Sequence, residues 1–243
     1  MDNNEQVIRI SVNSENQKAI QNATEGYAEF CKLLERLGNA LEQSIRQLPD
    51  SLIRLANSGW YISWDTAPAK IHEYAQLISE NRQIEVDNEI VAELEQETDR
   101  IAATLIRNFP HRRNVLKAAI RAHQDQNYYL SIPVFLSQIE GISKEITGFR
   151  FYKLKNNSPV VSSWVSKFEA NTFNALLLNP LNIVNESRQL QIVNNPLGIN
   201  RHDVLHGDCF DYGEDRINSF KCLSQLLYLG DVVFTIKRDL KSE

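Results

Sequence analysis

Residues 128–148 have the sequence YYLSIPVFLSQIEGISKEITG, and this stretch decides the fold. Its high density of apolar side chains predicts a helix that is buried in the protein core. Pro133 fits this helix, because proline is tolerated in the first turns, where no backbone N–H has to be donated. Glu140 lies late in the same helix. A glutamate in such a setting either has a charged partner in the interior, for which Arg201 is the candidate, or faces water on the polar side.

Helical spacing continues on both sides of this stretch. It predicts a long helix from Ser14 or Asn16 to about residue 47, ended by Pro49-Asp50, with a short strand before it at 7–12. Further helices are predicted over residues 50–57, 67–82, 84–108, 111–126, 160–178, 198–206 and 214–239. Gly207 is expected to end the helix at 198–206 in a left-handed cap, and Glu214 or Asp215 to cap the last helix. The chain has only nine glycines and lacks repeated hairpin signals, so the predicted fold class is all-α, a helical bundle.

The composition limits the classes of function. The 243 residues are 42% apolar and 23% charged, which is enough apolar material for a core and argues against disorder. The formal charge of −5 does not suit a protein that binds nucleic acid through its overall charge. Three cysteines without CxxC spacing, a polar N-terminus and no long apolar run predict a cytoplasmic protein without disulfides or a membrane span.

Residues 201–206, RHDVLH, are the main candidate for chemistry. His202 and His206 are four apart and therefore share a face of a helix, and the long Arg201 side chain can reach toward the same opening. Histidine can take or give a proton near neutral pH, and a guanidinium holds a phosphate with two parallel hydrogen bonds. The pattern therefore suits phosphoryl chemistry without a cofactor. The alternative is a helix end whose positive side chains complement the helix dipole.

Three other features have a functional and a structural interpretation. His202, His206 and Cys209 have a spacing that zinc ligands use, although a fourth ligand is not evident nearby. Arg112, Arg113 and Lys117, followed by Arg121, could contact an RNA backbone or form a solvated helix face. Trp60, Tyr61 and Trp64 could stack on bases, but such a cluster is more often part of a core. The sequence has no P-loop and no GxGxxG, GxSxG or HExxH motif.

Several segments together resemble the HEPN family (higher eukaryotes and prokaryotes nucleotide-binding), in particular a bacterial subset. The similarity lies in NRHDVLHG at 200–207, in Tyr212-Gly213 and Asn218 before the last helix, and in AHQDQNYYLSIPVFLSQIEGI at 122–142. The resemblance covers roughly 111–238. It implies a HEPN-like domain of four or five helices at 111–243, with an insertion at about 149–197. Residues 1–110 lie outside the resemblance, and their spacing predicts a helical N-terminal region.

The resemblance also implies a function. Many members of this family are metal-independent endoribonucleases of toxin–antitoxin or antiphage systems, and others are inactive modules that bind RNA or protein. Transferred to this sequence, His206 acts as general base or acid, Arg201 stabilises charge on the phosphate, and His202 positions the phosphate or His206. Glu140 corresponds to an acidic residue of the preceding helix. The resemblance further implies a homodimer, and an antitoxin or regulatory protein as a partner.

Overall fold

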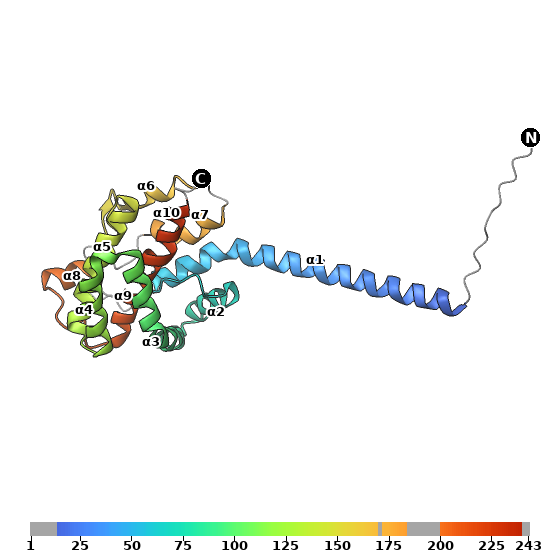
Figure 1. Cartoon of the computed structure of the whole chain (residues 1–243), viewed down its shortest axis with the longest axis horizontal. Helices are drawn as coiled ribbons and strands as arrows, with labels where there is room; N and C mark the ends of the chain where they lie inside the picture. The colour runs from blue at the N-terminus through green and yellow to red at the C-terminus, as the bar shows by residue number, and fades with distance from the viewer. Residues whose placement is uncertain (1–13, 170–171, 184–199, 240–243) are drawn as a thin grey trace, which may run out of the picture. The chain divides into compact units, whose positions relative to one another are not determined.

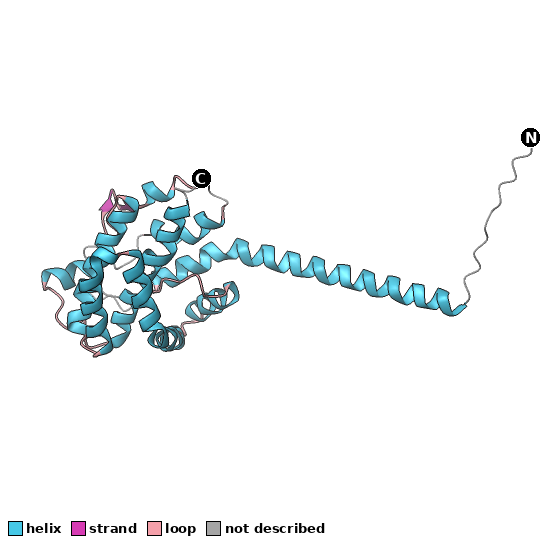
Figure 2. Ribbon diagram, in the orientation of Figure 1, coloured by secondary structure: helices cyan, strands magenta, loops and turns pink. Residues whose placement is uncertain are grey.

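The computed structural model describes residues 14–169, 172–183 and 200–239, and its fold is all-α, as predicted. Within these residues the strands are limited to a small antiparallel hairpin, magenta in Figure 2. It pairs β1 (Leu154–Lys155) with β2 (Ser158–Pro159). Its tight turn has positive φ angles at Asn156 (52°) and Asn157 (57°), a conformation that asparagine tolerates better than most residues. The strand predicted at 7–12 lies outside the described residues.

The chain divides into two compact units, residues 1–46 and residues 47–243. The predicted division at 110/111 does not coincide with a gap in the packing. Ile101 and Leu105, which precede that position, are fully buried in the same apolar cluster as Phe135 of the buried central helix. The helices before residue 110 thus supply part of the core that the later helices need, and the region from 47 onward packs as one body.

Helix α1 (Ser14–Asn57) is continuous through Pro49, so the predicted break at Pro49-Asp50 is wrong. Pro49 removes one backbone hydrogen bond from the helix. The residues around it compensate, because Leu48, Leu52 and Leu55 are all buried within the 47–243 unit. Burial of three leucines stabilises the helical conformation by about 1.5–3 kcal/mol each, which exceeds the cost of roughly 3 kcal/mol for an interior proline.

Helices α2 (Pro68–Ser79) and α3 (Gln83–Asn108) confirm the predictions for 67–82 and 84–108. Proline at the first position of α2 has the backbone angle that a helix start requires. The end of α1 and these two helices share a second apolar cluster, which includes Leu48, Leu52, Leu55, Trp60, Ile71, Tyr74, Val86, Ile90, Val91 and Phe220. Phe220 links this cluster to the C-terminal part of the chain.

The centre of the 47–243 unit is helix α5 (Tyr128–Thr147), which is buried as predicted and includes Pro133. A 3₁₀ turn, η1 (Pro110–Arg112), leads into α4 (Arg113–Gln124), which packs along α5 (Figure 1). Helix α9 (Arg216–Leu227) packs against α5 as well. Gly148 ends α5 with φ 85°, a left-handed cap that favours glycine.

The segment after α5 differs from the predicted helix at 160–178. It forms α6 (Ser162–Val165), α7 (Phe173–Leu178) and a 3₁₀ turn, η2 (Asn179–Asn182). Phe151, Val161 and Trp164 belong to the main apolar cluster. The proposed insertion at 149–197 is therefore part of the core over its described residues. Short pieces replace one long helix because each places one or two large side chains in that core.

Helix α8 (Arg201–His206) is followed by a loop, and the last predicted helix, 214–239, has three parts. These are α9, a π-helical turn η4 (Tyr228–Val233) and α10 (Phe234–Asp239). The Asp215 side chain accepts a hydrogen bond from Ile217 N at 2.9 Å and caps α9, as predicted. In the wider π turn, the Asn108 side chain donates to the Gly230 carbonyl at 2.8 Å. This bond ties α3 to the turn.

Candidate functional site

Helix α8 is short, and its two ends are fixed by local chemistry. The Asn200 side chain accepts a hydrogen bond from His202 N at 2.9 Å, which caps the first turn. Gly207 ends the helix with φ 83°, the left-handed cap that its glycine predicted. Val204 is buried and anchors one face in the main apolar cluster. His202 and His206 each lie two residues from Val204 and so point to the opposite face of α8, whereas Arg201 starts the helix.

Glu140 is buried and lies between two arginines, so the first of its two interpretations is correct. Its side chain is 6% exposed. Arg201 Nε lies 3.8 Å from Glu140 Oε1, and Arg150 Nη1 lies 3.9 Å from Oε2. These separations are those of ion pairs rather than of hydrogen bonds. The carboxylate holds the Arg201 guanidinium near the end of α5, and Arg201 is itself only 27% exposed.

His202 and His206 share a face of α8, as their spacing predicted. Their ring centroids are 4.2 Å apart with an angle of 50° between the planes. His206 is exposed and His202 is half-buried. Both imidazoles are therefore within reach of a ligand at the surface, and each can exchange a proton with it.

A hollow of about 350 Å³ lies beside this helix. It is lined by Glu140, Arg150, Tyr152, Lys153, Leu154 and Arg201. Three cations and one buried carboxylate thus line the hollow, which gives it a net positive charge inside an acidic protein. Such a site favours an anion like phosphate. The Tyr152 hydroxyl donates to the buried Gln225 side chain, and this bond fixes one wall.

Arg150 and Lys153 also line the hollow, although the sequence did not indicate either of them as a site residue. Both follow the left-handed cap of α5, in a loop whose direction depends on how Phe151 and Tyr152 enter the core. The only signal in the sequence is that two basic residues flank two buried aromatic ones in RFYK at 150–153. Nothing in that pattern points to the Arg201 helix, which lies fifty residues farther along the chain.

The proposed RNA-contacting residues do not behave alike. Arg112 donates to Glu145 Oε2 from Nε at 3.1 Å and from Nη2 at 3.0 Å, and to Gln138 Oε1 from Nη1 at 3.0 Å. It is thus held against α5, where it packs over Gly141. Arg113 and Lys117 are exposed. These two remain accessible to a phosphate backbone, whereas Arg112 has a structural role.

The aromatic cluster is mostly core, as its more frequent interpretation predicted. Trp60 and Tyr61 are buried, and Trp64 is 38% exposed. Trp60 Nε1 donates to the buried Asp87 carboxylate at 2.7 Å. A larger hollow of about 710 Å³ lies next to Tyr61. Its charged groups are neutralised locally, for example Arg100 by Asp65 at 2.8 Å and Lys70 by Glu89 at 2.6 Å. It offers less to an ionic ligand than the smaller hollow.

The zinc alternative has no support in the geometry. Cys209 Sγ donates to Asp211 Oδ1 at 3.2 Å. Across residues 14–169, 172–183 and 200–239, no three histidine, cysteine or carboxylate side chains come together as metal ligands would. In the same ranges no helix combines the length and the apolar character of a membrane span.

Known protein families, curated proteins and solved structures, compared with this chain, gave no match. The resemblance to the HEPN family therefore stays a prediction. What this site does has to be inferred from its own residues.

Proposed function

We propose that the protein is a metal-independent endoribonuclease and that Arg201 and His206 carry its chemistry. The observation that supports the proposal most is the cationic hollow beside α8. Arg201, Arg150 and Lys153 line this hollow together with the buried Glu140, and Arg201 shares helix α8 with two accessible imidazoles. Phosphodiester cleavage needs a site that holds an anion and a group that transfers a proton, and α8 carries residues for both.

The proposed step uses the ribose of the substrate. His206 accepts the proton of the 2′-hydroxyl, and the 2′-oxygen attacks the adjacent phosphorus. The bond between phosphorus and the 5′-oxygen breaks, and that oxygen leaves with a proton taken from water. The products are a 2′,3′-cyclic phosphate and a 5′-hydroxyl, so the reaction is specific for RNA. Arg201 stabilises the charge that builds on the phosphate, and His202 positions the phosphate or His206.

Glu140 is a positioning residue in this scheme. Its carboxylate forms an ion pair with the Arg201 guanidinium and holds that group at the wall of the hollow. An arginine held in this way loses less side-chain freedom when it binds a phosphate. Arg113 and Lys117 are exposed and can extend the contact with the RNA backbone.

We further propose the biological setting that the HEPN resemblance implies. The protein would act in the cytoplasm as a prokaryotic toxin or antiphage effector. Two copies would place their motifs at one cleft, with an antitoxin or regulatory protein as a further partner. A homodimer would also double the number of cations at the site, which offsets the net acidity of the chain.

One observation favours a second candidate, a module that binds RNA or protein without cleaving it. Arg201 is largely buried and paired with Glu140, so the motif also has a structural role in joining α8 to α5. In this case RNA binds at the same cations but is not cut.

The test compares wild type with His206→Ala on single-stranded and structured RNA in excess EDTA. His206 is exposed, so its removal leaves the fold intact. We expect the cleavage rate to fall by about 10²–10⁴-fold, which is the usual contribution of a general base or acid. His111→Ala is the matched control, because His111 is another exposed histidine, on the turn before α4. Equal cleavage by wild type and His206→Ala would overturn the assignment. RNA binding without cleavage by wild type would favour the second candidate.

A further inference from the structure

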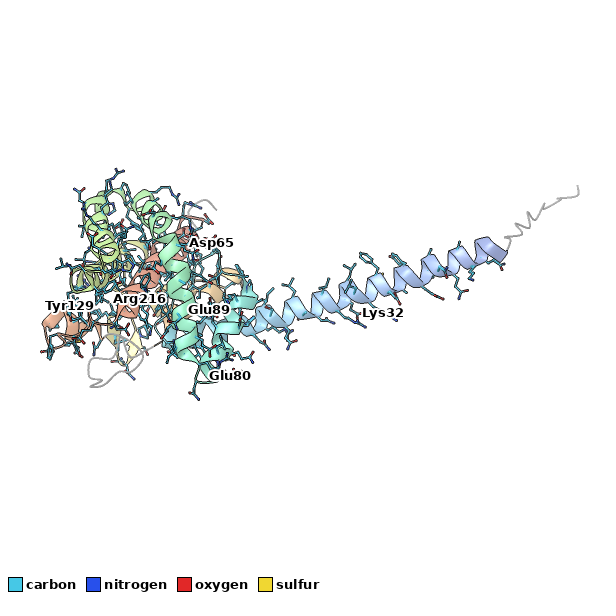
Figure 3. All side chains as sticks on the ribbon, turned by 90° about the horizontal axis from the view of Figure 1, so that it is seen from below. Lys32, Asp65, Glu80, Glu89, Tyr129 and Arg216 are labelled. Atoms are coloured by element: carbon cyan, nitrogen blue, oxygen red, sulfur yellow. The ribbon has the colours of Figure 1, made fainter. Side chains whose placement is uncertain are left out.

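Helix α1 carries a row of exposed apolar side chains before it enters the 47–243 unit. All seven are more than one third exposed: Tyr27, Phe30, Leu33, Leu34, Leu37, Leu41 and Ile45. Figure 3 draws the side chains of this stretch and labels Lys32 among them. Isolated apolar residues on a surface need no explanation, but a continuous row of large ones marks an interaction site.

The row has the period of a coiled coil. Tyr27, Leu34 and Leu41 are seven residues apart, and Phe30 and Leu37 lie three residues after the first two of them. These are the a and d positions of a heptad repeat, with Ser44 at the next d position. Leu48 continues the a series and is buried in the 47–243 unit. The exposed row is therefore in phase with an apolar face that the protein does bury.

The charged residues are separated from this row. From residue 25 to residue 46 each of them falls at a b, c or f position, on the opposite face: Glu25, Glu29, Lys32, Glu35, Arg36, Glu42 and Arg46. Two of them, Arg46 and Glu42, pair along the helix at 2.6 Å. The e and g positions of the same stretch are uncharged. They are Leu33 and Ile45, which belong to the row, and Gly26, Cys31, Gly38 and Ala40.

This distribution indicates what covers the row. Partners of a different sequence are usually selected by charges at the e and g positions, and identical helices are kept apart when these positions carry like charges. The e and g positions of α1 carry no charges that could select a different partner or repel a second copy of the same helix. Two copies of the same face can meet with apolar side chains alone. Seven side chains of this exposure offer on the order of 800 Å² per copy, which matches the share of one partner in a standard interface.

We propose that residues 27–45 of α1 form a coiled-coil interface with the same segment of a second copy of this chain. The inference does not depend on the proposed nuclease function, because it uses no residue of that site. If both hold, the α1 interface keeps two 47–243 units in one assembly and so raises the effective concentration at which their motifs meet.

The experiment measures the mass of the full chain by light scattering and sedimentation over a range of concentrations. The wild type is expected at twice the 27.9 kDa of one chain or more. Leu34→Glu with Leu37→Glu places charges at an a and a d position. We expect the dissociation constant to rise by more than about 100-fold, because these residues are at the centre of the interface. The mass then falls by half or more.

The matched control is Asn39→Glu with Gln43→Glu, which adds the same charge to the same helix at f and c positions. We expect this variant to keep the wild-type mass. Thermal unfolding checks that the 47–243 unit is intact in both variants, since none of the four positions lies in it. A wild type with the mass of a single chain would overturn the proposal; the row would then be covered by the same chain or by another protein. An unchanged mass in the Leu34/Leu37 variant would also overturn it, and would assign the assembly to another surface without affecting the nuclease site.

Discussion

At the scale of single residues, the unusual feature is a charge inside an apolar helix. Glu140 lies in the core helix α5 of the 47–243 unit and is stabilised there by Arg201 and Arg150. Burying a carboxylate costs several kcal/mol of solvation free energy, and nearby cationic partners offset this cost. The need for a partner could be predicted from the sequence, and so could Arg201. Arg150 could not, because its position depends on the path of the loop after α5.

Replacing Glu140 with glutamine tests the pairing directly. The side chain keeps its size, but the two arginines lose their counter-charge and face an amide. We expect the free energy of unfolding, measured by urea titration, to fall by about 1–3 kcal/mol. Glu95→Gln is the control, since Glu95 pairs with Arg216 at 3.7 Å but both side chains are at least half exposed. A change of less than about 1 kcal/mol is expected there. Equal losses in the two variants would show that burial adds nothing to the Glu140 pairs.

A second buried polar residue gives a pH dependence. His123 is 4% exposed, with Nδ1 2.8 Å from Ser219 Oγ, and burial lowers its pKa to about 4. The folded protein therefore keeps this imidazole neutral, whereas the unfolded chain binds a proton below its ordinary pKa of 6.5. More protons bound in the unfolded state means that stability falls as pH is lowered from 6.5 toward 4.

We expect His123 to account for about 2–3 kcal/mol of the stability lost in that pH range. His123→Gln, which can still hydrogen-bond Ser219, should be less stable at pH 7.5 but should lose correspondingly less on acidification. Urea unfolding from pH 7.5 to 4.5 measures this. His111→Gln is the control, because His111 is exposed. Identical pH slopes for wild type and His123→Gln would contradict the assignment.

At the scale of elements, the spacing of apolar residues and the helix caps predict most of the helices. They fail where tertiary packing overrides the local preference of the chain. The predictions for α2, α3 and α5 and the Gly207 cap are confirmed because apolar period and caps agree there. In the sequence, Pro49 predicts a helix break, but buried leucines on both sides keep α1 helical. The π turn at Tyr228–Val233 has no distinct signal in the sequence, since its apolar residues are compatible with an ordinary helix.

Gly230 in that turn allows a prediction. A Cβ at this position would clash with Leu105 Cδ2 and lie 3.4 Å from Phe109 Cε2, and both residues are buried. Gly230→Ala should therefore lower the free energy of unfolding by about 1–3 kcal/mol through overpacking. Leu105→Ala alone should cost about 2–5 kcal/mol because it leaves a cavity.

The double variant separates steric conflict from other effects. With alanine at position 105 the added methyl group has room, so the combined loss should be smaller than the sum of the single losses by about 0.5–3 kcal/mol. Chemical unfolding of the four proteins gives this coupling. If the loss in the double variant equals the sum of the two single losses, the clash with Leu105 is not the reason that position 230 requires glycine.

At the scale of the whole molecule, an acidic chain gathers positive charge at one place. Arg150, Lys153 and Arg201 come from two segments that are fifty residues apart in the sequence, and they meet only because α5 and α8 pack together. The all-α class could be predicted from helical spacing and the small number of glycines. The boundary of the compact units could not be predicted in this way. Ile101 and Leu105 precede the predicted boundary at residue 110 but pack into the same core as residues that follow it.

The central claim is that this site cuts RNA by attack of the 2′-hydroxyl, and one measurement addresses it most directly. Wild-type protein is incubated in excess EDTA with an RNA that it cleaves and with the same oligonucleotide carrying a single 2′-deoxyribose at the cut position. We predict cleavage of the RNA to a 2′,3′-cyclic phosphate and no cleavage at the deoxyribose, since the attacking oxygen is missing there. Cleavage of both substrates at equal rates, or no cleavage of any RNA, would contradict the proposed mechanism.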